Sequence, residues 1–162
     1  VNPEEFVNRF RTHVEAGDEV VGIFLSSLLS GTFQSASIAR DIVDETHIFV
    51  VDSGAVTFGL GLLVEYAVML RDQGRSAAQI AEEVQAISGR VRLLAVVDTL
   101  KYLKMGGRIS GASAVLGGML GITPILKVQH GVVEAAAKVR GRKAAFQWMD
   151  RRMEQELSLI HI

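Results

Sequence analysis

The sequence predicts an α/β fold: a parallel sheet with helices on both faces, followed by part of a second α/β (α+β) domain. Up to Asp98, short apolar runs rich in β-branched residues alternate with segments of helical periodicity. This alternation is typical of parallel strands joined by right-handed helical crossovers. Beyond Asp98 the chain changes to short, glycine-separated segments and a hairpin signal, so we place a domain boundary near residue 98.

The first domain, residues 1–98, is expected to begin with a helix. Phe6, Phe10 and Val14 recur at a spacing that puts them on one helical face. Ser76 has the character of an N-cap, with apolar residues following on one face of the next helix. The expected helices are 3–15, 31–44, 56–73 and 76–88, and the expected strands are 19–25, 46–51 and 91–97.

The second domain, residues 99–162, is expected to open with short helices over 99–121. Two strands should follow within 123–139, because the His130-Gly131 pair between two apolar runs is a hairpin signal. A charged helix over 142–157 completes the pattern. We expect the first domain to be truncated at its N-terminus and the second at its C-terminus. Residues 157–162, which include the terminal SLIHI, carry no interpretable signal.

Composition excludes several classes of function. The chain has 162 residues, with 17 basic against 18 acidic side chains and no cysteine. The charge balance argues against a general nucleic-acid binder, and the lack of cysteine removes disulfides, thiolate catalysis and cysteine-ligated zinc. No run approaches the roughly 18 apolar residues of a membrane span, and no signal-peptide pattern opens the chain. We expect a cytoplasmic, bacterial-type protein without stable membrane insertion.

The segment Ser26-Ser27-Leu28-Leu29-Ser30-Gly31-Thr32 is the strongest candidate for a ligand site. It follows the apolar run EVVGIFL and leads into an expected helix. A strand end with hydroxyls and a glycine before a helix presents backbone N–H groups and O–H donors to one point, which suits a carboxylate or phosphate. An ordinary helix N-cap is the alternative interpretation.

Ligands of open parallel sheets bind beyond the carboxyl ends of the strands, which makes the other strand ends candidates too. The three expected ends supply Ser26, Ser27, Ser30, Gly31 and Thr32, then Asp52, Ser53 and Thr57, then Asp98 and Thr99. Asp52 and Asp98 are a weak metal candidate, since such acids more often cap helices. No histidine (His13, His47, His130 or His161) has the motif context of a catalytic base. We interpret Gly59 and Gly61 as sites of close helix packing rather than a nucleotide motif.

Two basic features lie downstream. Arg108 follows Gly106-Gly107 at the end of a short expected helix, and a guanidinium there suits bidentate contact with phosphate or carboxylate. Four cations lie between residues 138 and 143, namely Lys138, Arg140, Arg142 and Lys143. A solvated surface is the alternative interpretation for both features.

Three segments together resemble the DegV family of bacterial fatty acid-binding proteins: SSLLSGTFQSA, LKYLKMGGRIS and TPILKVQHGVVEAAAKVRGRKAA. Their order and spacing match, and the resemblance runs from about Pro3 to about Met149. It implies a two-domain protein that buries a long-chain fatty acid between its domains. It further implies a non-enzymatic subunit, with no cofactor besides the bound fatty acid, that presents the acyl carboxylate to a separate ATP-dependent fatty acid kinase.

The resemblance also implies roles for individual residues. Ser30 matches the serine that hydrogen-bonds the carboxylate, and Gly31 and Thr32 supply the adjoining helix N-terminus. Ser27, in the same loop, is also expected to bind the carboxylate. Arg108 and Arg140 match arginines implicated in kinase engagement and phosphotransfer. Two family elements that help to hold the carboxylate, a TSQ threonine and a His-x-Gly segment, would fall before Val1 and after Ile162.

Two other functions remain open on the sequence alone. An enzyme acting on a phosphorylated or carboxylated small molecule at the strand ends would turn over its substrate without a partner. A scaffold that binds nucleic acid through the basic run is disfavoured by the charge balance. Under the family reading, the apolar segment 112–126 (ASAVLGGMLGITPIL) would help to enclose the acyl chain, and no local motif specifies that chain's length or saturation.

Overall fold

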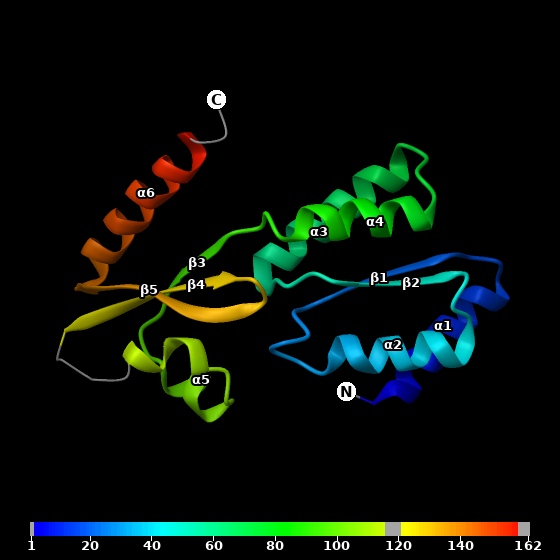
Figure 1. Ribbon diagram of the computed structural model, residues 1–162, viewed down its shortest axis with the longest axis horizontal. Helices are drawn as coiled ribbons and strands as arrows, with labels where there is room; N and C mark the ends of the chain where they lie inside the picture. The colour runs from blue at the N-terminus through cyan, green and yellow to red at the C-terminus, as the bar shows by residue number, and fades with distance from the viewer. Residues whose placement is uncertain (1, 116–120, 159–162) are drawn as a thin grey trace. The chain divides into compact units, whose positions relative to one another are not determined.

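The computed structural model describes residues 2–115 and 121–158 and forms two compact units (Figure 1). The first unit extends to Val91 and includes Gln129–Val132. The second extends from Arg92 to Val128 and resumes at Val133. The division therefore precedes residue 98, because strand β3 (Leu93–Val96) pairs within the second unit.

Two parallel strands form the centre of the first unit. β1 (Val20–Phe24) pairs with β2 (Ile48–Asp52) so that Phe24 lies opposite Asp52. Figure 1 shows helices on both sides of this sheet, α1 (Pro3–Glu15) and α2 (Thr32–Val43) on one and α3 (Thr57–Asp72) and α4 (Ala77–Ser88) on the other. The predicted class, a parallel sheet covered by helices, is confirmed.

Side chains of β1 alternate between two hydrophobic clusters, as the pleat of a strand requires. Val21 and Ile23 pack against the cluster under α3 and α4, and Val20 and Phe24 pack against the cluster under α1 and α2. The buried members of the first cluster are Val51, Ala55, Leu63, Ala67, Leu70, Ile80 and Val84, and those of the second are Phe10, Ala36, Ala39 and Ile48. The sheet therefore supplies core to both layers of helices.

Two helices of the first unit begin at a side-chain cap. The Asn2 side chain accepts a hydrogen bond from the Glu4 N–H, and Pro3 occupies the first turn of α1. Ser76 and Gln79 form a reciprocal capping box at α4, as the N-cap assignment of Ser76 predicts. These local bonds satisfy donors that an uncapped helix leaves unpaired.

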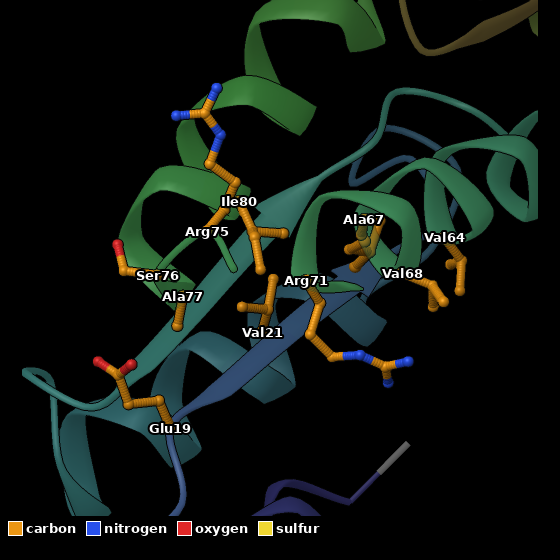
Figure 2. Close-up of a pocket in the computed structure, with 11 residues that line it drawn as sticks. Glu19, Val21, Val64, Ala67, Val68, Arg71, Arg75, Ser76, Ala77 and Ile80 are labelled. Atoms are coloured by element: carbon orange, nitrogen blue, oxygen red, sulfur yellow. The ribbon is translucent and has the colours of Figure 1, made fainter. Parts of the chain in front are cut away.

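A hollow of about 450 Å³ lies along β1 between α3 and α4 (Figure 2). Val21 of β1 faces it together with Ala67 and Val68 of α3 and Ile80 of α4. Its lining is mainly aliphatic, and it lies along the body of the strand rather than at its carboxyl end. It is therefore separate from the loop 26–32, which the sequence singles out as a candidate ligand site.

An antiparallel sheet organises the second unit. β3 pairs antiparallel with β4 (Ile122–Gln129), and β4 neighbours β5 (Val132–Arg140) in the order β3-β4-β5. The remaining elements are α5 (Lys101–Met105), a 3₁₀ segment (Ser110–Val115) and α6 (Arg142–Ser158). The predicted hairpin at His130-Gly131, the short helices and the final helix are confirmed, and residues 116–120 and 159–162 lie outside the described residues.

The expectation that residues 91–97 form a third parallel strand of the first sheet is wrong. β3 has Leu93 opposite Val128 and Val96 opposite Ile125 in the antiparallel sheet of the second unit. A short apolar run fits either kind of sheet, because its pattern records burial and not the direction of its neighbour. The hairpin strand β4, distant in sequence, provides the partner.

The pH dependence of stability can be tested at Asp44, which follows α2. Its carboxylate accepts hydrogen bonds from the Thr46 hydroxyl (2.6 Å) and N–H (2.7 Å), and its Oδ2 lies 2.8 Å from His47 Nδ1. The Thr46 hydroxyl, followed by His47, lowers the pKa of Asp44 far below the ordinary 3.8. Because folding favours the ionised form, this stabilisation is complete well above pH 3.8 and is lost as the pH falls toward the folded-state pKa.

We expect Asp44→Asn to lower the free energy of unfolding at neutral pH, with a difference from the parent that shrinks in acid. Urea denaturation of both proteins at about pH 7 and about pH 2 measures this difference. Thr46→Val, which removes the principal hydrogen bond, should reproduce part of the effect. A difference that stays constant across this range would contradict the assignment.

Candidate functional site

The loop between β1 and α2 is held by its own backbone. The Ser26 carbonyl accepts hydrogen bonds from the N–H groups of Leu29 and Ser30, both at 3.0 Å. The Ser26 N–H donates to the Ala55 carbonyl at 3.0 Å, and Ser26 is fully buried. The hydroxyl-rich segment therefore forms a compact turn that brings Ser30 to the start of α2.

Ser30 and Thr32 lie together at that helix start. Their hydroxyl oxygens are 2.9 Å apart, and the Thr32 N–H donates to Ser30 Oγ at 3.3 Å. Gly31 occupies the cap position, and the first turn of α2 contains no acidic residue. A helix N-terminus carries partial positive charge, so two half-buried hydroxyls beside it suit a carboxylate or a phosphate. The structure thus brings together three of the predicted carboxylate-binding residues.

Ser27 joins this loop to the end of β2. Its backbone N–H donates to Asp52 Oδ1 at 3.1 Å, and the Gly54 N–H donates to the same oxygen at 3.0 Å. Ser53 is buried and its hydroxyl is occupied in its own turn, accepting from the Ala55 N–H at 3.1 Å and donating to the Ala55 carbonyl at 3.3 Å. Asp52 and Ser53 therefore act as turn-forming residues here. Thr57 is exposed at the start of α3 and has a φ of 50°.

A polar hollow of about 390 Å³ opens at the carboxyl ends of β1 and β2. It is lined by Ser26, Ser27, Leu28, Asp52, Ser53, Gly54, Gln85, Ser88, Gly89, Val91, His130 and Gly131. Gln85 and Ser88 reach the hollow from the last turn of α4, and no local sequence motif marks either residue. Gln85 Nε2 donates to the Asp52 carbonyl at 3.3 Å, so it supports the second strand end.

The tip of the hairpin also lines this hollow. Residues Gln129–Val132 group with the first unit, and the Ser26 hydroxyl donates to the Gly131 carbonyl at 2.6 Å. In the sequence, His130-Gly131 is recognisable only as a turn and has no visible link to the serine-rich loop. A separation of 105 residues leaves no local pattern that could connect the two.

The third expected strand end belongs to the second unit and to a different sheet. Asp98 lies in the second unit, where its carboxylate pairs with Arg142 at 2.6 Å. Thr99 accepts the Lys101 N–H at 3.1 Å and so supports the start of α5. The expectation that both residues follow a strand of the parallel sheet is wrong, because β3 belongs to the antiparallel sheet. The weak Asp52–Asp98 metal hypothesis therefore loses its basis.

Arg108 and Arg140 both belong to the second unit and are both exposed. Arg108 follows α5 and bonds back to the Gly106 carbonyl, while its N–H donates to the Leu103 carbonyl at 2.9 Å. Arg140 is the last residue of β5. Within the basic run, Arg142 pairs with Asp98 and lies 5.6 Å from the centre of the Phe146 ring, so part of that run has a structural use.

The histidines are separated in the structure. His13 lies 3.1 Å from Asp18, His47 pairs with Asp44, and His130 is exposed at the hairpin tip, 3.2 Å from the side-chain nitrogen of Gln129. His161 lies outside the described residues. No group of three or more histidine, aspartate or glutamate side chains suited to a metal ion occurs within the described part of the chain.

The two α3 glycines differ. A Cβ on Gly59 would lie 3.0 Å from Val91 Cγ1 and 3.4 Å from the Ala55 Cβ, which confirms close packing there. A Cβ on Gly61 would meet nothing within 4 Å, so the packing interpretation is wrong for that residue.

The apolar segment 112–126 is only partly described. Ala112, Ile125 and Leu126 are buried in the second unit, whereas residues 116–120 lie outside the described range. Among the described residues no helix has the length and hydrophobicity needed to cross a membrane.

Comparison with curated proteins places the chain among known relatives. A DegV domain-containing protein of Caldanaerobacter subterraneus subsp. tengcongensis is 39% identical over 168 residues, covering 99% of this chain and 60% of that protein. A second, from Deinococcus radiodurans, is 42% identical over 144 residues, covering 89% of this chain and 51% of that protein. The chain thus spans little more than half the length of these relatives.

Solved structures show the same fold. A DegV family protein from Thermus thermophilus, described as binding fatty acid, superposes with a TM-score of 0.87 at 35% identity, covering 95% of this chain and 55% of that one. DegV from Bacillus subtilis, described as a fatty acid binding protein, has a TM-score of 0.80 at 31% identity, covering 96% and 56%. The family model of DegV proteins matches residues 1–159, and the chain belongs to the DegV family.

Proposed function

We propose that this chain contributes to the binding of a long-chain fatty acid, with the carboxylate at the start of α2. The observation that carries the proposal is the pair of hydroxyls of Ser30 and Thr32, 2.9 Å apart at a helix N-terminus without an acidic residue in its first turn. Similar proteins from Thermus thermophilus and Bacillus subtilis, described as fatty acid binding, support the choice of a fatty acid over other anions.

The head group and the tail would contribute differently to affinity. Burying about 14 methylenes corresponds to roughly 11 kcal/mol at about 0.8 kcal/mol each, before the losses of motional freedom on binding. A hydrogen bond to a charged group adds only about 1.5–3 kcal/mol. The apolar tail therefore provides most of the affinity, while Ser30, Gly31, Thr32 and the neighbouring Ser27 orient the carboxylate.

We further propose that the chain is part of a cytoplasmic, non-enzymatic subunit that presents this carboxylate to a separate fatty acid kinase. The exposed Arg108 and Arg140 would meet the kinase subunit or the phosphate being transferred. Arginine suits this role because its planar guanidinium binds phosphate through paired hydrogen bonds. An enzyme acting alone at the strand ends is less well supported, since Ser26 and Ser53 use their hydroxyls in structural hydrogen bonds.

The binding step can be tested by native mass spectrometry of the protein purified from a bacterial host. We expect an added mass equal to one long-chain fatty acid per chain, released on denaturation and identified by extraction. Protein stripped of lipid should regain this mass when mixed with palmitate or oleate. Protein that remains ligand-free in both experiments would contradict fatty acid binding by this chain.

Ser30→Ala should alter carboxylate orientation more than overall affinity. We expect binding of palmitate to weaken by about tenfold, as the loss of one charge-assisted hydrogen bond predicts, and acyl phosphate formation with a fatty acid kinase subunit and ATP to fall further. Ser37→Ala is the matched control, because the Ser37 hydroxyl donates within α2 to the Phe33 carbonyl at 3.0 Å. Equal phosphorylation rates for Ser30→Ala and its parent would exclude the orienting role.

Arg108→Ala should separate binding from transfer. We expect palmitate occupancy to stay unchanged while acyl phosphate formation falls by more than about tenfold, because a charge-assisted contact is lost. Arg151→Ala, which removes an equal charge from the exposed surface of α6, is the control. A parallel fall in both variants would point to a general charge effect rather than a specific one.

A further inference from the structure

Ser26 lies in the same loop as the proposed carboxylate contacts but is not one of them. Its N–H, its carbonyl and its hydroxyl all have partners inside the first unit. The hydroxyl donates to the Gly131 carbonyl at 2.6 Å and accepts the Leu28 N–H at 3.2 Å. Because Ser26 is fully buried and all of its polar groups form hydrogen bonds, it has a structural role rather than a direct contact with the ligand.

The hydrogen bonds of Ser26 hold Ser30 in position, and the proposed function depends on Ser30. The carbonyl of Ser26 accepts the Ser30 N–H at 3.0 Å, which fixes the loop between β1 and α2 at both ends. The hydroxyl bond to Leu28 braces the same turn from within. Rotation or loss of the Ser26 side chain would therefore loosen the segment that sets the Ser30 hydroxyl beside Thr32.

The hairpin tip supplies the partner of the Ser26 hydroxyl, which is the carbonyl of Gly131. Gly131 has a φ of +79°, which glycine adopts readily and other residues rarely. A Cβ built on Gly131 would lie 2.9 Å from Ser26 Oγ and 3.2 Å from Leu28 Cδ1. Both the backbone conformation and the close approach to Ser26 therefore require glycine.

We propose that Ser26 is a positioning residue of the carboxylate-binding loop, held in its working rotamer by the Gly131 carbonyl of the hairpin tip. The proposal rests on the proposed function for its consequence in ligand binding. Its structural half, that the Ser26–Gly131 contact holds Ser30 in place, stands without any ligand. The two halves therefore need separate readouts.

The structural half is tested by amide hydrogen exchange of the ligand-free chain. Ser26→Ala should speed exchange of the Ser30 and Leu29 amides by about tenfold, the loss expected for one buried hydrogen bond. Gly131→Ala disturbs the contact from the opposite side while leaving the amino-acid sequence of the loop unchanged, and it should give the same pattern. Ser53→Ala is the control, since it removes a buried serine hydroxyl from the turn after β2. Equal exchange at Ser30 in all three variants would overturn the proposal.

The functional half is tested by comparing palmitate with hexadecanol, which has the same tail without the carboxylate. If Ser26 positions the carboxylate loop, Ser26→Ala should weaken palmitate binding by about tenfold and leave hexadecanol binding nearly unchanged. Equal weakening of both ligands would show a general loss of structure and overturn the positioning role. If the parent binds neither ligand, the proposed function fails, while amide exchange still decides the structural half.

Discussion

The parallel pairing of β1 with β2 is the constraint on which the candidate site depends. Because Phe24 lies opposite Asp52, both strands end at the same level and their following turns lie side by side. The Ser53 N–H donates to the Phe24 carbonyl at 3.0 Å, and Asp52 accepts the Ser27 N–H at 3.1 Å across the two turns. A shift of register by one residue would break these hydrogen bonds and turn the side chains of one strand to the opposite face.

The hydroxyls at these strand ends divide into two kinds. Ser26 and Ser53 are buried, and their hydroxyls form hydrogen bonds with the backbone of turns. Ser30 and Thr32 are half-buried, contact each other and lie at the start of a helix. A hydroxyl can rotate to meet an incoming anion only if its burial and backbone partners leave it that freedom. This difference is the reason that the proposed carboxylate contacts are Ser30 and Thr32 rather than their equally polar neighbours.

The sequence predicted the elements well because most of them are specified locally. The N-cap at Ser76, the face formed by Phe6, Phe10 and Val14, and the turn at His130-Gly131 are each readable within a few residues. The turn from Ser26 to Thr32 was also readable as a local structure, since hydroxyls and a glycine between a strand and a helix are typical of a helix start. The partner of β3 was not readable, because an apolar run of four residues carries no record of the strand that it meets.

By itself, the sequence determined the order of helices and strands, the two-part organisation and the loop from Ser26 to Thr32. Only the tertiary structure decided which strand ends lie on one sheet: it placed Asp98 and Thr99 in the second unit and brought Gly131 to Ser26. The physical reason is the range of the interactions. Caps, turns and amphipathic faces are set by neighbours along the chain, whereas strand pairing and a buried hydrogen bond across 105 residues are set by the packing of the folded chain.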